Sequence, residues 1–494
     1  MILKKKPQEV RSPKTPKKNS SPYFIALQNI IVPFLWILFI GNLSFLMYHY
    51  PDIPEWVHGN FLRFNGFTLL IWTTVTFFSA IVGSYAENYL QGYRYRSRFK
   101  LFCLGFTLSV MTLVLSEHII LFLIGWSLMA FFMSRLIGID SDWGEAREAS
   151  KFSQRYFLTG TVFLSVGVIL PAFKSGAFTI TGLAASVADL PGYVVFFAAL
   201  CIIVAAVVQS AIYPFHRWLL SAMTAPTPAS ALMHAGFVNG AGILLALFST
   251  LLFASDTMNV LLIVGGLTAI IAQFTKLLQV NVKQKLACST IAQMGFMIMQ
   301  CGLGFFNAAV VHLILHGFYK AYLFLASGEE IASSKPEKPL RISIKPIQAI
   351  VVLLFGCVGA VLFAILTGKG TETDSGVFLT LIVAITVGQA TYNIVKQRSL
   401  SILHKFILPP VLFISGIGMY ALLYNGVTIL MADLPMVAVP LPLSIVHVVF
   451  GIVFLIGFFI MKLGIYHKVP WLYVKLLNLS QPYKKSILLY KNNS

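Results

Sequence analysis

Apolar residues form long stretches along almost the whole chain, instead of the alternating or one-faced patterns that are typical of water-soluble proteins. Runs of about 18 or more apolar residues are long enough to cross a bilayer as helices. The pattern therefore predicts an all-α polytopic membrane protein with about 14 transmembrane helices. The predicted spans are 25–48, 64–86, 100–116, 118–138, 154–172, 192–213, 228–253, 257–278, 286–305, 308–327, 347–367, 376–396, 405–430 and 441–463.

Basic residues fall mainly in every second connection between these spans. If the N-terminus lies inside the cell, these connections face the cytoplasm, and the opposite side holds only Arg63, Lys174 and Lys369. Such a bias sets the orientation of membrane proteins. We therefore expect both termini to be cytoplasmic. The basic residues on the cytoplasmic side are Arg94, Arg96, Arg98, Lys100, Arg147, Lys151, Arg155, Arg217, Lys283, Lys285, Lys335, Lys338, Arg341, Lys345, Lys396, Arg398 and Lys405.

Composition divides the chain into three parts. With 57% hydrophobic and 11% charged residues among 494, the chain is not a soluble enzyme. Its net charge of +19 lies in loops and tails, so we expect no nucleic acid as a partner. Residues 1–21 predict a disordered basic cytoplasmic tail, residues 22–463 a transmembrane domain, and residues 464–494 a basic amphipathic tail at the cytoplasmic membrane surface. The five cysteines lie in apolar segments without CxxC spacing, and we interpret them as small core residues.

A polar stretch interrupts the apolar pattern between residues 214 and 242. It carries His216 and Arg217, then the prolines Pro226 and Pro228, which predict a sharp helix start, and His234 about two turns into that helix. Asn239 follows in the same stretch. Buried polar groups are costly in a membrane. The stretch is therefore either an ion path through the bundle or a cytoplasmic loop followed by a helix with one packed histidine.

Three titratable residues share one face of the tenth predicted span. His312, His316 and Lys320 are spaced four apart, which places them one helical turn above the next over about 12 Å. This column has the geometry of a proton relay, and the alternative is a polar stripe packed in a static bundle. Lys276 near the end of the eighth span is either an internal proton-loading site or a lysine whose amine reaches the membrane surface.

Several strings resemble one family of membrane proteins. PFHRWL followed by APTPASALMHAG resembles the signature of the proton-translocating antiporter-like subunits of complex I and Mrp antiporters. More narrowly, HAGFVNGAG and ACSTIAQMGFMIMQCGLG resemble the membrane subunit of the DAB inorganic-carbon accumulation transporter. The resemblance covers about residues 100–330. It implies an antiporter-like fold with two inverted five-helix repeats, near 118–253 and 257–396, each with a broken helix, and it matches the spacing of the histidine–lysine column.

The first half departs from this family pattern. The family places a glutamate in a GWE motif and a lysine in a KSA motif, where this chain has Ser127 and Gln209. Replacement of both charged residues by neutral ones is physically consistent, because replacing only one would leave the other as an unpaired buried charge. Ser127, Gln209, His234 and Asn239 then remain for a water-mediated path without an ion pair.

The resemblance implies a cation-translocating subunit, with H⁺ as the cation, in the inner membrane of a bacterium. Its implied partner is a large cytoplasmic zinc protein related to β-carbonic anhydrases, in which cation flow drives hydration of CO₂ to bicarbonate. This chain is then a transporter subunit and not an enzyme. No cofactor or metal site is expected in it, because it has no phosphate-binding loop and no metal-ligand cluster. Membrane lipids fit the basic loops equally well.

Two alternatives to this function remain. The first is a complex I or Mrp-type Na⁺/H⁺ antiporter subunit, and the second is a membrane anchor that does not transport. Two smaller expectations concern the side opposite the cytoplasm. We expect Lys369 to be an exposed loop residue, and Glu117 with His118 to form either an outer mouth or a solvated turn.

Overall fold

The computed structural model describes residues 22–327, 346–396, 401–464, 466 and 468–487. The predicted tail 1–21 and the basic connection at 328–345 lie outside the described residues. Within these ranges the chain is a bundle of helices, as predicted. The long helices are α1 (Pro22–His49), α2 (Gly66–Tyr89), α3 (Arg96–Leu115), α4 (Ile119–Ile137), α5 (Gly144–Ser175), α7 (Gly192–Gln209), α12 (Met258–Leu277), α13 (Val282–Gly302), α14 (Phe306–Leu325), α16 (Pro346–Thr367), α17 (Gly376–Lys396), α18 (Ile402–Leu430) and α19 (Ile445–Leu463).

Shorter elements connect the long helices. One is an antiparallel hairpin, β1 (Trp56–His58) with β2 (Leu62–Phe64), which the sequence pattern did not predict. The short α-helices are α6 (Ile180–Ser186), α8 (Arg217–Ser221), α9 (Thr227–Ala235), α10 (Gly240–Leu247), α11 (Ser249–Ala254) and α20 (Pro470–Leu479). The single 3₁₀ turns are η1 (Val187–Asp189), η2 (Ala222–Thr224), η3 (Phe237–Asn239) and η5 (Lys484–Ser486).

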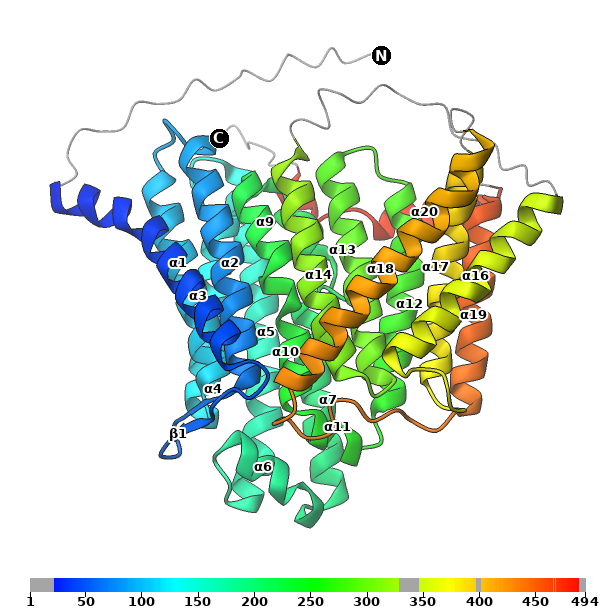
Figure 1. Cartoon of the computed structure of the whole chain (residues 1–494). Coiled ribbons are helices and arrows are strands. Elements are labelled where there is room, and N and C mark those ends of the chain that lie inside the picture. The colour runs from blue at the N-terminus through cyan, green and yellow to red at the C-terminus, as the bar shows by residue number, and fades with distance from the viewer. Residues whose placement is uncertain (1–21, 328–345, 397–400, 465, 467, 488–494) are drawn as a thin grey trace.

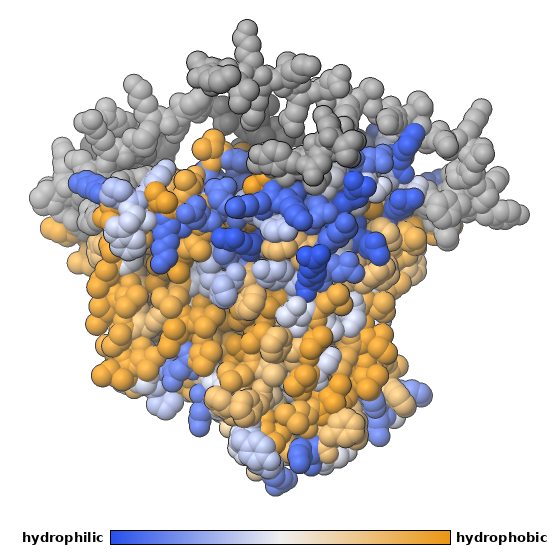
Figure 2. All heavy atoms as spheres, turned by 180° about the vertical axis from the view of Figure 1, so that it is seen from behind, coloured by the Kyte–Doolittle hydropathy of each residue, from blue (hydrophilic) through white to orange (hydrophobic). Residues whose placement is uncertain are grey.

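The bundle has the surface of a multi-pass membrane protein. In the part of the chain that the structure describes, eleven helical segments are long and apolar enough to cross a bilayer. The predicted spans 286–305, 376–396 and 441–463 are also helical but are not among these eleven. Apolar side chains cover the sides of the bundle, and hydrophilic residues gather in a band near one end (Figure 2). Helices suit this surface because they satisfy their backbone hydrogen bonds internally.

Two long elements differ from the predicted spans. Helix α5 begins at Gly144, ten residues before the predicted span at 154, so Arg147 and Lys151 lie on a helix instead of in a loop. The predicted span at 228–253 is broken. Helix α9 begins at Thr227 with Pro228 in its first turn, as the proline pair predicts, and ends before Gly236. A 3₁₀ turn and two short helices then continue the segment.

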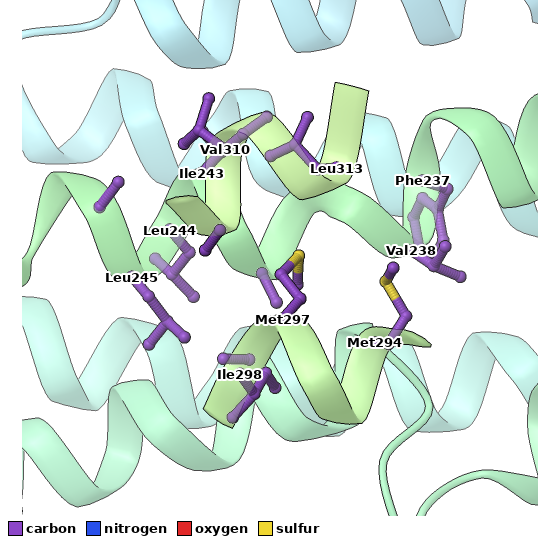
Figure 3. Close-up of a cluster of buried hydrophobic side chains, with 14 of the residues drawn as sticks. Phe237, Val238, Ile243, Leu244, Leu245, Met294, Met297, Ile298, Val310 and Leu313 are labelled. Atoms are coloured by element: carbon purple, nitrogen blue, oxygen red, sulfur yellow. The ribbon is translucent and has the colours of Figure 1, made fainter. Parts of the chain in front are cut away.

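The broken segment packs tightly into the centre of the bundle. Side chains of η3 and α10 interdigitate with those of α13 and α14 (Figure 3). Gly242 permits this approach, because a Cβ atom there would lie 3.0 Å from the sulfur of Met297 and 3.1 Å from a methyl group of Leu313. The packing brings the polar residues of α9 beside those of α13 and α14.

The last described segment of the chain returns across one end of the bundle. Residues 470–487, which we call the C-terminal strap, contain α20 and η5. Helix α20 lies at the same end of the bundle as the first turns of α1 (Figure 1). The backbone N–H of Tyr483 donates to the hydroxyl of Ser221 at 2.9 Å, and the Tyr483 ring stacks on Phe152 with ring centroids 4.3 Å apart. The strap thus packs against α5 and α8, although it lies far from both in the sequence.

Candidate functional site

The histidine–lysine column lies on α14 as its spacing predicts. The rings of His312 and His316 are nearly parallel, with centroids 6.1 Å apart and an interplanar angle of 14°. Lys320 is 0% exposed one turn further along. Neither ring nitrogen of His316 has a hydrogen-bond partner among the described residues. The column is therefore a run of proton-binding groups in which His316 and Lys320 are buried and His312 is half-buried.

Lys320 has a single neutral hydrogen-bond acceptor in the described structure. Its Nζ donates to the backbone carbonyl of Leu286 on α13 at 3.0 Å. The ion pairs of the described residues all lie elsewhere, namely Arg63–Glu55, Arg96–Glu87, Lys100–Glu87 and Lys151–Glu148. Keeping an ammonium group away from water without a carboxylate is costly. Such a lysine is suited to releasing its proton.

His234 reaches the same region from α9. It is 0% exposed, and its Nδ1 lies 2.9 Å from the hydroxyl of Thr290 on α13. The Thr290 hydroxyl also donates to the Leu286 carbonyl at 3.1 Å, the same oxygen that Lys320 contacts. The His234 ring stacks on Phe324 of α14, with centroids 4.4 Å apart. His234 thus lies with the column of α14.

The other polar residues predicted in the first half bind backbone carbonyls. Gln209 Nε2 donates to the carbonyl of Phe237 at 3.0 Å. Asn239 Nδ2 donates to the carbonyls of Ala235 at 2.7 Å and Leu313 at 3.2 Å. Both side chains therefore satisfy backbone groups at and beside the break between α9 and α10.

Ser127 does not join this group. It is exposed on α4, and its hydroxyl donates to the carbonyl of Leu123 in its own helix at 2.7 Å.

A cavity of about 670 Å³ adjoins the column between α12, α13, α14, α17 and α18. Its polar lining includes Gln273, Lys276, Gln293, Gln300 and His312. Nε2 of His312 and the side-chain oxygen of Gln300 are buried without a partner in the described ranges. Lys276 and one residue of the column, His312, therefore line the same cavity. No group of three or more His, Cys, Asp or Glu side chains among the described residues could hold a metal ion.

The structure corrects the expectation for Lys369. This residue lies in the connection between α16 and α17, but it is only 4% exposed. Its Nζ lies 3.8 Å from the centre of the Tyr424 ring and 4.7 Å from that of Phe305, in cation–π contact. Burial lowers the pKa of Lys369 to about 7. The surrounding TGKGTETDS string has the composition of an exposed turn. The local sequence does not reveal the burial of Lys369, because the aromatic rings that cover it are distant in the sequence.

Two other expectations are also wrong in part. Glu117 is 5% exposed and accepts hydrogen bonds from the backbone N–H of Thr181, at 3.0 Å, and from the Thr181 hydroxyl. Glu117 is therefore buried against Thr181 of α6 and does not form a solvated turn. Cys357 on α16 is exposed, whereas Cys103, Cys288 and Cys301 are buried as expected and Cys201 is half-buried.

Comparisons with known proteins agree with this architecture. The sequence model described as NADH:quinone oxidoreductase/Mrp antiporter, TM, matches residues 116–371. A probable inorganic carbon transporter subunit DabB of Bacillus anthracis is 36% identical over 304 residues, which are 60% of this chain and 59% of that protein. The chain thus spans about three fifths of the length of this curated relative.

Two solved structures share the fold. The Mrp complex of Dietzia sp. DQ12-45-1b aligns with a TM-score of 0.63 at 18% identity, covering 93% of this chain and 58% of that one. The membrane-bound sulfane sulfur reductase, an archaeal respiratory membrane complex, aligns with a TM-score of 0.59 at 18% identity, covering 93% and 94%.

Proposed function

Because the chain belongs to the NADH:quinone oxidoreductase/Mrp antiporter transmembrane family, we propose that it translocates protons as the membrane subunit of an inorganic-carbon accumulation complex. The name of the Bacillus anthracis relative supports the choice of inorganic carbon within this family. The Ser127 and Gln209 replacements support it further, since they remove the charged pair that the resemblance implies for antiporter subunits.

The burial of Lys320 carries this proposal. An ammonium group that is 0% exposed and has only a carbonyl acceptor is costly to keep, and proton exchange gives a reason to keep it. His316 lies one turn away with two unpartnered ring nitrogens, and His312 lies one turn further. A proton released by Lys320 would pass to a neutral ring of the column, because neutral imidazole has one acceptor nitrogen.

The cavity supplies one end of the proposed path. Lys276 and His312 line the same cavity, so a proton held at Lys276 would reach the column through it. His234 adds a further proton-binding group beside Lys320. In the first half, the amide nitrogens of Gln209 and Asn239 donate to backbone carbonyls, and we assign these two residues to holding the broken segment in place instead of carrying protons.

We further propose the complex in which this path works. Both termini face the cytoplasm in the inner membrane of a bacterium, following the basic residues of the even-numbered connections. A large cytoplasmic zinc protein of the β-carbonic-anhydrase type docks on that face, and proton flow drives its hydration of CO₂ to bicarbonate. Zinc would belong to that partner. Exposed basic residues such as Arg217, Lys484 and Lys485 provide positive charge for this contact or for lipid headgroups.

The test compares Lys320→Ala with Gln209→Ala. Both variants are expressed with the partner gene in a carbonic-anhydrase-deficient host, and growth in ambient CO₂ is measured with membrane levels checked by blot. We expect Lys320→Ala to abolish growth while the zinc protein still co-purifies, since only the proton-binding group is lost. Gln209→Ala should be milder, because glutamine does not hold the proton.

Other outcomes would replace this proposal. Growth of Lys320→Ala like the parent, with failure of Gln209→Ala, would move the path to the first half. Growth of both variants with the partner bound would favour an anchor without transport. Co-purification with NADH-oxidising subunits in place of a zinc protein would indicate a complex I subunit.

A further inference from the structure

We propose that Thr290 is a positioning residue that holds His234 in the tautomer protonated at Nδ1. In this tautomer Nε2 is the atom that takes up and releases a proton. The inference rests on the proposed proton path and adds to it a residue that neither the column motif nor the cavity indicates.

The assignment begins with the single hydrogen of the Thr290 hydroxyl. That hydroxyl donates to the carbonyl of Leu286, one helical turn earlier, at 3.1 Å. Its oxygen therefore has only lone pairs left for His234, whose Nδ1 lies 2.9 Å away. We assign the hydroxyl hydrogen to the Leu286 carbonyl, so the hydrogen of the contact with His234 is on Nδ1 and the Thr290 oxygen accepts it. The second ring nitrogen of the neutral side chain is then an acceptor.

The rest of the site leaves Nε2 available. Nε2 of His234 is buried and has no hydrogen-bond partner among the described residues. The opposite tautomer would bury an unsatisfied N–H at this position, which is more costly than an unsatisfied acceptor. The stack on Phe324 restricts rotation of the ring, with an interplanar angle of 21°. Thr290 and Phe324 together therefore fix the direction of Nε2.

The same contacts link His234 to Lys320. The carbonyl of Leu286 accepts from both the Thr290 hydroxyl and the Lys320 ammonium group. One oxygen on α13 thus orients a proton-binding group on α9 and another on α14. Thr290 contributes to the path through this geometry and does not itself carry the proton.

The test uses two variants that separate the effect of the Thr290 hydroxyl from the effect of the shape of the side chain. Thr290→Val removes the hydroxyl and keeps a branched side chain, whereas Thr290→Ser keeps the hydroxyl. The purified chain, labelled with ¹⁵N-histidine and reconstituted in lipid vesicles at pH 8, is studied by solid-state NMR. The His234 signal is assigned by its absence in His234→Gln. Transport is measured by the growth assay above.

We expect His234 to be protonated at Nδ1 in the parent and in Thr290→Ser. In Thr290→Val the Nε2-protonated form should appear, because loss of one hydrogen bond changes the tautomer ratio by about tenfold. Transport should fall in Thr290→Val in proportion to the fraction of His234 that leaves the Nδ1-protonated form, and it should stay near the parent level in Thr290→Ser.

Three results would overturn the inference. The first is an Nε2-protonated His234 in the parent, and the second is parental transport by Thr290→Val. The third is loss of transport by Thr290→Ser while His234 keeps the parental tautomer, because this would indicate that Thr290 acts only through packing. Failure of the proposed function can be distinguished from failure of this inference. It would appear as parental transport by Lys320→Ala, whereas the tautomer of His234 is measured by NMR and does not depend on transport.

Discussion

Acidification should release the C-terminal strap through His216. This residue lies between α7 and α8, outside the membrane-spanning segments, and is 1% exposed. Its Nε2 donates to the carbonyl of Leu479 in the strap at 2.7 Å, and its ring lies 3.8 Å from that of Tyr213. Burial lowers the pKa of His216 to about 4. The docked strap therefore holds a neutral histidine.

The sign and size of the effect follow from this lowered pKa. With the strap released, His216 is exposed and its pKa returns to about 6.5. Docking is then fully favourable above about pH 6.5, and it weakens as pH falls toward 4, because the released state binds the proton more tightly. The loss is about 1.4 kcal/mol per pH unit, which is about 2 kcal/mol at pH 5.0 and about 3 kcal/mol at pH 4.

Hydrogen–deuterium exchange of residues 470–487 measures this release directly. Between pH 7.5 and pH 5.0, after correction for intrinsic exchange rates, the strap amides should exchange about 30-fold faster, which corresponds to about 2 kcal/mol. The control is His216→Gln, which keeps an N–H donor but does not titrate, so its strap should respond little to pH. Equal protection at both pH values in the parent, or an equal loss in His216→Gln, would refute the reasoning.

Two further substitutions test packing and buried charge. Gly295→Ala should destabilise the protein by about 1–3 kcal/mol, because its Cβ would lie 2.6 Å from the carbonyl oxygen of Gly265 and 2.7 Å from the N of Ala269. Thermal unfolding in detergent checks this, and Gly416→Ala, which meets nothing within 4 Å, should behave like the parent. The free energy of unfolding of Lys369→Met should rise relative to that of the parent as pH falls from 9 to 7, by about 1.4 kcal/mol per pH unit. The reason is that the unfolded parent binds the lysine proton more tightly than the folded parent, and the difference should become constant below pH 7. A difference that does not vary with pH would mean that Lys369 does not titrate as its burial requires.

Features that depend on local pattern could be predicted from the sequence. The length of the apolar runs identified a helical membrane protein, because a bilayer accepts few other backbone structures. The alignment of His312, His316 and Lys320 followed from the helical period, and the start of α9 followed from Pro228, which favours a first turn. Each of these features is decided within a few residues of chain.

The positions of the predicted groups relative to one another were decided by helix packing. Thr290 lies 56 residues after His234, and no local pattern pairs them. The break at Gly236 and the close approach at Gly242 bring α9 and α10 against α13 and α14.

Lys369 and the C-terminal strap show the same limit. Lys369 is buried by Tyr424, which follows it by 55 residues, and the strap meets His216 across 263 residues. The sequence by itself determined which groups could hold a proton. Which of them face one another was decided only by tertiary structure, because side-chain contact depends on the approach of helices that are distant in the chain.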